Sequence, residues 1–197
     1  MFCKNKKEIP CEIAKNTLPL QRKTNKYMTE KVRVSQDFLF EYLKGHDVNL
    51  KTLAELMGTS SGLVYDCFLH RLDRYGNPRV FTKVALPKLN AALPLLAAHL
   101  REHVIAYGTS EMFTNRYGRI YDPGTVPAFK ALSKYFSLTS LCHRVLGWSG
   151  GKKMSIFCVP SSKVYGNITA EDVSRINAEL LAVAGMLDGI EVEPAYL

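Results

Sequence analysis

One short segment carries the residue types of a serine hydrolase. The segment GWSGG, residues 147–151, fits the G-x-S-x-G pattern, in which a serine stands on a sharp turn between a strand and a helix. That geometry needs a strand directly before the serine, whereas the preceding SLCHRVL has the apolar spacing of a helix. Ser149 and Lys152 also fit S-x-x-K, but the S-D-N and K-T-G segments that accompany this pattern are missing. We therefore do not expect Ser149 to act as a nucleophile.

A second segment, HLREH at residues 99–103, has the spacing of a zinc site. His99 and His103 are one helical turn apart, and Glu102 stands beside them as a base would in the H-x-x-E-H pattern. Such a site needs a third ligand and a cleft, and the same residues fit the polar face of the helix that carries Leu96. The favoured interpretation is a solvated helix face. The sequence thus predicts no metal, no other cofactor and no enzyme.

The composition is that of an ordinary soluble protein with one large core or two small ones. Of 197 residues, 47% are hydrophobic and 22% are charged. The five cysteines are odd in number and never form a CxxC pair, which argues against both a disulfide framework and a zinc knuckle. The chain has neither a run of about eighteen apolar residues nor an apolar segment after its first lysines. We therefore expect a cytoplasmic protein with no membrane span and no secretory signal.

The positive charge is concentrated near the N-terminus. Residues 1–27 hold seven Lys or Arg against two Glu, which is +5 and leaves +3 of the total +8 for the rest of the chain. This leader also lacks hydrophobic periodicity. We expect residues 1–33 to form a flexible basic tail that adds nonspecific attraction to phosphates.

The chain contains an internal repeat. The triplet YGN occurs in LDRYGNPRVF and again in SSKVYGNITA. A helical apolar pattern follows each YGN, and the two patterns are 87 residues apart. The same offset relates Leu89-Asn90-Ala91 to Ile176-Asn177-Ala178. Upstream, TLAELMG and SLCHRVLG match at an offset of 88 or 89, each a short apolar helix that ends in glycine. The order of elements is the same in both halves, so we infer a tandem duplication.

The segment LKTLAELMGTSSGLVYDCFL, from Leu50 to Leu69, has the spacing of a helix-turn-helix. Ala54 leaves room where two helices cross, Gly58 suits the sharp turn, and Val64 lies on the inner face of the second helix. This segment resembles the motif of lambda-repressor-like (Cro/repressor, XRE-type) regulators of phages and bacteria: a small residue, a glycine four residues later and a Val or Ile six after that. The second copy, LTSLCHRVLGWSGGKKMSIF, has one extra residue before its glycine and is a degenerate version.

The resemblance and the repeat together predict an all-α protein with two tandem helix-turn-helix domains. Helix starts are expected at the capping residues Ser35, Asn49 and Thr82, and at a capping box formed by Thr169 and Asp172. The expected order is a flexible basic tail (1–33), a first helix-turn-helix domain (34–106), a Gly-, Tyr- and Pro-containing linker (107–125) and a second, degenerate helix-turn-helix domain (126–197). Within the linker, MFTNRYGRIYD can form a small β-hairpin.

Turn and proline residues add local expectations. We expect Tyr75 to pack the first YGN turn, and Gly76 and Asn77 to take its left-handed positions. Pro87 and Pro94 are expected to kink or split the helical stretch that follows this turn.

The resemblance also implies which residues contact DNA. In that family the second helix of the motif enters the major groove with its N-terminal residues on base edges. The residues carried over are Thr59, Ser60, Ser61, Tyr65, Asp66, Arg71 and Arg74 in the first copy, and Ser149, Gly150, Lys152, Lys153 and Lys163 in the second. The first set lacks Arg, Gln and Asn at the exposed start of the helix, the side chains with the strongest bidentate base readout.

These features support two hypotheses of different classes. One is a sequence-specific transcriptional regulator of phage or mobile-element origin, which binds double-stranded DNA as a pseudo-dimer within one chain and gains further contacts if it forms a homodimer. The alternative is a helical adaptor module whose motif surface docks onto another protein. Neither hypothesis involves a membrane.

Overall fold

The computed structural model describes residues 31–108, 111, 113–114, 120–122, 124–150 and 168–195. These residues are mostly helical, which confirms the all-α expectation at the level of secondary structure. The helices are α1 (Gln36–Gly45), α2 (Leu50–Leu56), α3 (Ser61–Phe68), α4 (Ala85–Glu102), α5 (Thr125–Ala131), the 3₁₀ helix η1 (Leu132–Lys134), α6 (Leu138–Leu146) and α8 (Ala170–Gly189). The strands are β1 (Val32–Val34), β2 (Phe113–Thr114), β3 (Ile120–Tyr121) and β4 (Ile190–Val192).

Side-chain caps set the starts of several helices. The Ser35 hydroxyl accepts a hydrogen bond from the backbone N–H of the first turn of α1, and Asn49 does the same for α2. Thr169 and Asp172 form the predicted capping box at the start of α8. Thr82 accepts from the N–H of the first residue of α4. These bonds satisfy N–H groups that have no partner within their helices. The predicted starts at Ser35, Asn49 and Thr169 are confirmed, whereas the N-cap residue of α4 is Val84 and not Thr82.

The predicted split of the helix after the first YGN turn is wrong. Helix α4 runs unbroken from Ala85 to Glu102 with Pro94 inside it. Pro87 lies in the first turn, where a missing N–H costs no helical hydrogen bond. The apolar face of α4 is buried on both sides of Pro94, and this packing outweighs the local penalty of the proline.

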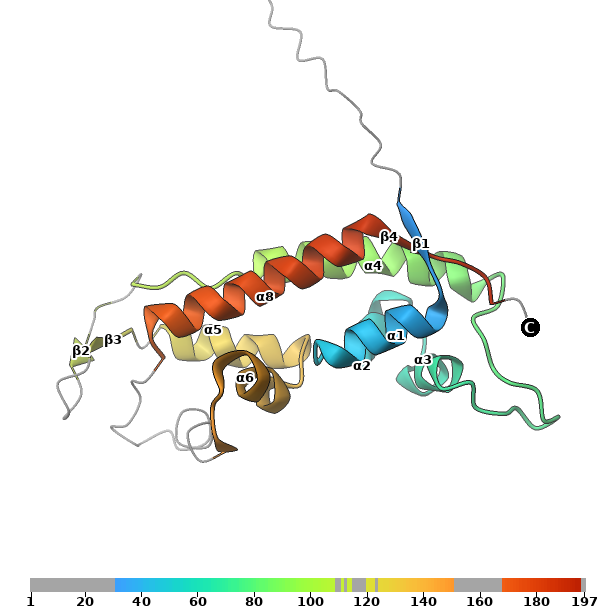
Figure 1. The fold of residues 1–197 in the computed structure, drawn as a ribbon, viewed down its shortest axis with the longest axis horizontal. Coiled ribbons are helices and arrows are strands. Elements are labelled where there is room, and N and C mark those ends of the chain that lie inside the picture. Colours follow the sequence, from blue (N-terminus) through green and yellow to red (C-terminus); the bar gives the residue numbers. More distant parts are fainter. Residues whose placement is uncertain are drawn as a thin grey trace, which may run out of the picture.

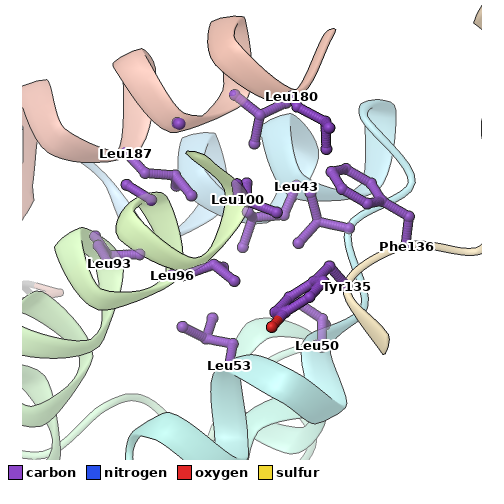
Figure 2. Close-up of a cluster of buried hydrophobic side chains, with 14 of the residues drawn as sticks. Leu43, Leu50, Leu53, Leu93, Leu96, Leu100, Tyr135, Phe136, Leu180 and Leu187 are labelled. Carbon is purple, nitrogen blue, oxygen red and sulfur yellow. The ribbon is translucent and has the colours of Figure 1, made fainter. Parts of the chain in front are cut away.

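Helices α4 and α8 lie side by side, and the shorter helices α1, α2, α3, α5 and α6 lie on one side of this pair (Figure 1). The buried apolar residues of both repeats form one cluster. Figure 2 shows its centre, where leucines of α4 and α8 meet leucines of the first repeat and aromatic residues of the second: Leu93, Leu96, Leu100, Leu180, Leu187, Leu43, Leu50, Leu53, Tyr135 and Phe136. The two halves of the chain therefore share one core.

The asparagines of the repeated Asn-Ala pairs form two equivalent clamps. The Asn90 side chain donates to the Val192 carbonyl at 3.0 Å and accepts from the Val192 N–H at 2.8 Å. The Asn177 side chain donates to the Ile105 carbonyl and accepts from the Ile105 N–H, both at 2.8 Å. Asn177 lies 87 residues after Asn90, and Val192 lies 87 residues after Ile105. Each helix thus begins beside the end of the other, so α4 and α8 are antiparallel and related by a pseudo-two-fold axis.

The segments that precede α2 and α6 also contact each other reciprocally. The Asn49 N–H donates to the Tyr135 carbonyl at 2.7 Å, and the Ser137 N–H donates to the Asp47 carbonyl at 2.8 Å. Asp47 and Tyr135 are 88 residues apart, and so are Asn49 and Ser137. The repeat in the sequence is therefore also a symmetry of the contacts between the two halves.

Two strand pairs complete the described part of the chain. Strand β1 pairs in parallel with β4, with Val32 opposite Ile190. The predicted tail boundary at residue 33 is wrong because β1 begins before it; residues 1–30 lie outside the described part. In the linker, β2 and β3 pair antiparallel, with Phe113 opposite Tyr121, as expected for the hairpin.

Candidate nucleic-acid interface

The predicted helix-turn-helix of the first repeat consists of α2, a turn and α3. Ala54 and Val64 are buried, as the spacing predicted. Gly58 has φ of +65°, the left-handed conformation that ends α2 sharply. The Thr59 N–H then donates to the Ala54 carbonyl at 3.0 Å, and Ser60 caps α3 by accepting from the Leu63 N–H. The local sequence therefore encodes the angle at which α3 leaves α2.

The start of α3 presents small polar groups and one aromatic ring to solvent. Ser60 is exposed, Ser61 is half-buried, and Tyr65 is 41% exposed. Thr59 lines a cavity of about 140 Å³ between the turn and the start of α4. These residues lie on or near the outer surface of α3, where the resemblance placed the groups that face DNA.

Asp66 has a structural partner that the sequence did not reveal. One carboxylate oxygen accepts from the Arg79 guanidinium at 2.8 Å, and the other accepts from the Arg71 guanidinium at 3.3 Å. The Asp66 side chain is only 22% exposed. Its carboxylate therefore ties α3 to the segment that follows, a role different from the contact with DNA that the resemblance implies.

Residues 71–79, which we call the wing, form a tight hairpin-like turn after α3. The Asp73 carboxylate accepts from the N–H groups of Tyr75 at 2.7 Å and Asn77 at 3.0 Å. The hydrogen bond from the Asn77 N–H is the largest cause that holds the pKa of Asp73 below its ordinary value. Gly76 takes the predicted left-handed conformation with φ of +83°, whereas Asn77 does not. Two further backbone hydrogen bonds, from Asp73 to Asn77 and from Gly76 to Asp73, close the turn.

The tip of the wing is exposed and carries a basic and an aromatic side chain. Tyr75 is 72% exposed, so the prediction that it packs the turn is wrong. The Arg74 guanidinium lies over the Tyr75 ring, 4.6 Å from its centroid. The connection from α3 to α4, which contains the wing, extends away from the helices (Figure 1).

In the second repeat, Ser149 and Gly150 are exposed just after α6. Gly147 ends α6 in the left-handed conformation with φ of +66°, as Gly58 does after α2. Ser149 therefore follows a helix, which is not the geometry of a nucleophile elbow. Trp148 is buried and stacks on Phe129. The predicted residues Lys152, Lys153 and Lys163 lie outside the described residues.

Comparisons with protein-family models, curated proteins and solved structures gave no match. Function is therefore inferred from the chain's own contacts. In the described part of the chain, no helix combines the length and the apolar character needed to cross a membrane.

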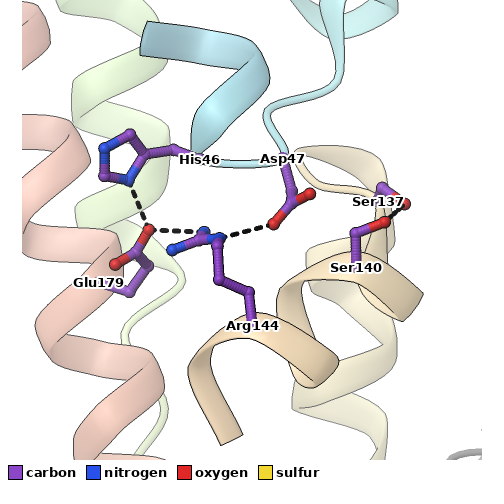
Figure 3. A network of polar contacts seen from close by, with 6 residues as sticks. All are labelled: His46, Asp47, Ser137, Ser140, Arg144 and Glu179. Atoms are coloured by element: carbon purple, nitrogen blue, oxygen red, sulfur yellow. Dashed lines mark hydrogen bonds and ion pairs between the residues drawn. The ribbon is translucent and has the colours of Figure 1, made fainter. Parts of the chain in front are cut away.

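An ion cluster that the sequence did not predict joins the two repeats (Figure 3). One Glu179 oxygen accepts from Arg144 at 2.7 Å and lies 2.6 Å from His46 Nδ1, and Arg144 also donates to Asp47 at 2.8 Å. Burial raises the pKa of Glu179, but the hydrogen bonds from Arg144 and His46 outweigh it and leave that pKa below its ordinary value. The partners are up to 133 residues apart, so no local pattern could identify them.

The two histidines of HLREH contact other residues of the fold. His103 Nδ1 lies 2.8 Å from the His99 carbonyl, and both imidazole rings contact Tyr135 edge to face. Among the described residues, no cluster of three or more His, Cys, Asp or Glu side chains could hold a metal ion.

Proposed function

We propose that this protein is a sequence-specific DNA-binding transcriptional regulator that acts as a pseudo-dimer within one chain. The observation that carries the proposal is the α2–turn–α3 unit. Its left-handed Gly58 and buried Ala54 and Val64 satisfy the packing rules of a helix-turn-helix and leave the start of α3 exposed. In such a unit, the exposed start of the second helix is the part that enters the major groove.

The symmetry of the contacts favours the pseudo-dimer. Regulators with this motif bind palindromes as dimers because two reading heads related by a two-fold axis match two half-sites. Here the Asn90 and Asn177 clamps relate helices α4 and α8 by a pseudo-two-fold axis within one chain. Because the second motif has an extra residue before Gly147, the two half-sites on DNA should be unequal.

In this proposal Ser60, Ser61 and Tyr65 face the groove, where hydroxyl groups can bond either base edges or phosphates. Basic residues bind the backbone: Arg71 and Arg74 in the first copy, and Lys152, Lys153 and Lys163 in the second. Such contacts supply affinity that is independent of sequence and falls as salt rises.

A selection from random duplexes with the whole chain tests the proposal. We expect enrichment of two unequal half-sites and a steep loss of affinity with salt. Ser61→Arg should add a guanine preference at one position, since Arg binds guanine bidentately in the major groove. Ser174→Arg, on the exposed side of α8, adds the same charge and should leave the enriched sequence unchanged. The regulator hypothesis fails if no sequence is enriched and no binding occurs at low salt.

A second candidate, a protein-docking adaptor, is favoured by the apolar residues around α3. Leu63, Leu69 and Leu72 are 40%, 45% and 66% exposed. If the chain binds no duplex, a protein ligand of this surface should lose affinity for Leu69→Asp. The same ligand should keep its affinity for Leu95→Asp, a matched control because Leu95 is 50% exposed on α4.

A further inference from the structure

A cavity of about 340 Å³ lies at the seam between the two repeats. Sites for small molecules commonly have volumes of about 300–1,000 Å³ and often lie where two domains meet. Helices α1, α2 and α3 and the segments before α2 and α6 contribute to its lining: Phe40, Lys44, Asp47, Val48, Leu50, Tyr65 and Ser137. The cavity therefore has the size and the position of a ligand site.

Contacts between the repeats fix the walls of this cavity. The Ser137 N–H donates to the Asp47 carbonyl at 2.8 Å, and an isolated antiparallel bridge joins Val48 to Phe136. Arg144 of the second repeat donates to the Asp47 carboxylate at 2.8 Å, so this carboxylate is already engaged within the protein (Figure 3). A preformed cavity loses little conformational entropy when a ligand enters, and its contacts contribute more of their energy to affinity.

The lining combines aromatic rings with a cation. Phe40 and Tyr65 supply the rings, beside aliphatic side chains. The Lys44 ammonium lies 5.8 Å from the centroid of the Phe40 ring, and its 3.7 Å contact with Glu41 joins two exposed side chains. Such an exposed ion pair contributes little energy, so a ligand anion can replace Glu41 at low cost. We propose that the cavity binds a small aromatic carboxylic acid, whose ring packs against Phe40 and Tyr65 and whose carboxylate binds the Lys44 ammonium.

Tyr65 connects this cavity to the proposed DNA surface. Its side chain is 41% exposed on α3, where the proposed function places it at the groove. A ring bound against Tyr65 holds that side chain in the cavity, so the acid and the duplex compete for the same tyrosine. Because coupling between two ligands is reciprocal, each lowers the affinity of the other by the same factor. This effect on DNA rests on the proposed function, whereas binding of the acid does not.

An NMR titration of the full chain with indole-3-acetate, and with its neutral analogue indole-3-acetamide, tests the binding site. Backbone signals of residues around the cavity should shift at millimolar acid, and the acid should bind more tightly than the amide. A single exposed ion pair changes affinity by up to about fivefold, so Lys44→Gln should weaken the acid by that factor and abolish its advantage over the amide. Lys51→Gln, on the exposed side of α2 and outside the cavity, is the matched control and should keep both affinities.

The aromatic wall and the effect on DNA are tested separately. Tyr65→Ala should weaken the acid and the amide alike, whereas Tyr65→Phe should keep both affinities because it retains the ring. Indole-3-acetate should weaken binding of the selected duplex to the wild type, and it should weaken it less in Lys44→Gln at the same concentration of acid.

The outcomes separate the site from its effect on DNA. Absence of shifts, shifts that lie only elsewhere, or equal affinities of the wild type for the acid and the amide overturn the cavity assignment. If the acid binds in the cavity and leaves the affinity for the duplex unchanged, the coupling through Tyr65 is overturned. A wild-type chain that binds the acid but no duplex refutes the proposed function together with the effect on DNA, and leaves the binding site standing.

Discussion

Removing one asparagine clamp should destabilise the whole fold. In Asn90→Ala, the Val192 N–H and carbonyl each lose their hydrogen-bond partner at a site where the Val192 side chain is buried. An unsatisfied buried polar group costs about 1–3 kcal/mol. The higher helix propensity of alanine offsets up to about 0.7 kcal/mol of this loss in the free energy of unfolding. Since the clamp is only partly buried and water can reach it, we expect a net loss of about 2 kcal/mol in the free energy of unfolding.

The pseudo-two-fold axis extends this prediction to the second clamp. Asn177→Ala removes the same two hydrogen bonds from Ile105 and should cost a similar amount. Asn90 and Ile105 are 15 residues apart in sequence, which is about 22 Å along a helix, so the two effects should add. The double variant should therefore lose about 4 kcal/mol.

Urea unfolding of the full chain measures these differences. With a slope of about 2 kcal/mol per molar, each single variant should shift the midpoint down by roughly 1 M. Lys88→Ala and Ser174→Ala are exposed on α4 and α8 and serve as controls with little expected change. A loss below about 0.5 kcal/mol for either asparagine would refute the assignment of the clamps as equivalent structural contacts.

Two further predictions concern the turn and the ion cluster. Gly58→Ala places a side chain at φ of +65° and should lower the free energy of unfolding by about 1 kcal/mol. Gly62→Ala, inside α3, should raise the free energy of unfolding by up to about 1 kcal/mol. Thermal unfolding measures both variants, and changes of the same sign would contradict the prediction. The folded pKa of Glu179 lies below its ordinary value of 4.5, so its contribution to stability is present above that pH and is lost as pH falls through the folded pKa. Unfolding free energies measured against pH should therefore fall more steeply in acid for the wild type than for Glu179→Gln, and parallel curves would exclude this role.

Much of the local structure was predictable from the sequence because it depends on neighbouring residues. Capping side chains act across two or three residues, so Ser35, Asn49 and Thr169 could be identified as helix starts. The Ala54, Gly58 and Val64 spacing likewise describes one turn between two helices. Pro94 shows the limit of such reasoning, since burial of the surrounding face of α4 decided that the helix continues.

The sequence by itself determined the helices, their caps and the existence of the repeat. Only the tertiary structure decided how the repeats combine. The clamps join residues up to 102 positions apart, β1 pairs with a strand near the other end of the chain, and Glu179 binds side chains of both halves. The ion pair between Asp66 and Arg79 likewise depends on the path of the wing, which brings Arg79 beside α3. The partners in such contacts cannot be identified from the sequence alone, because each contact depends on the packing of α4 against α8 or on the path of a loop.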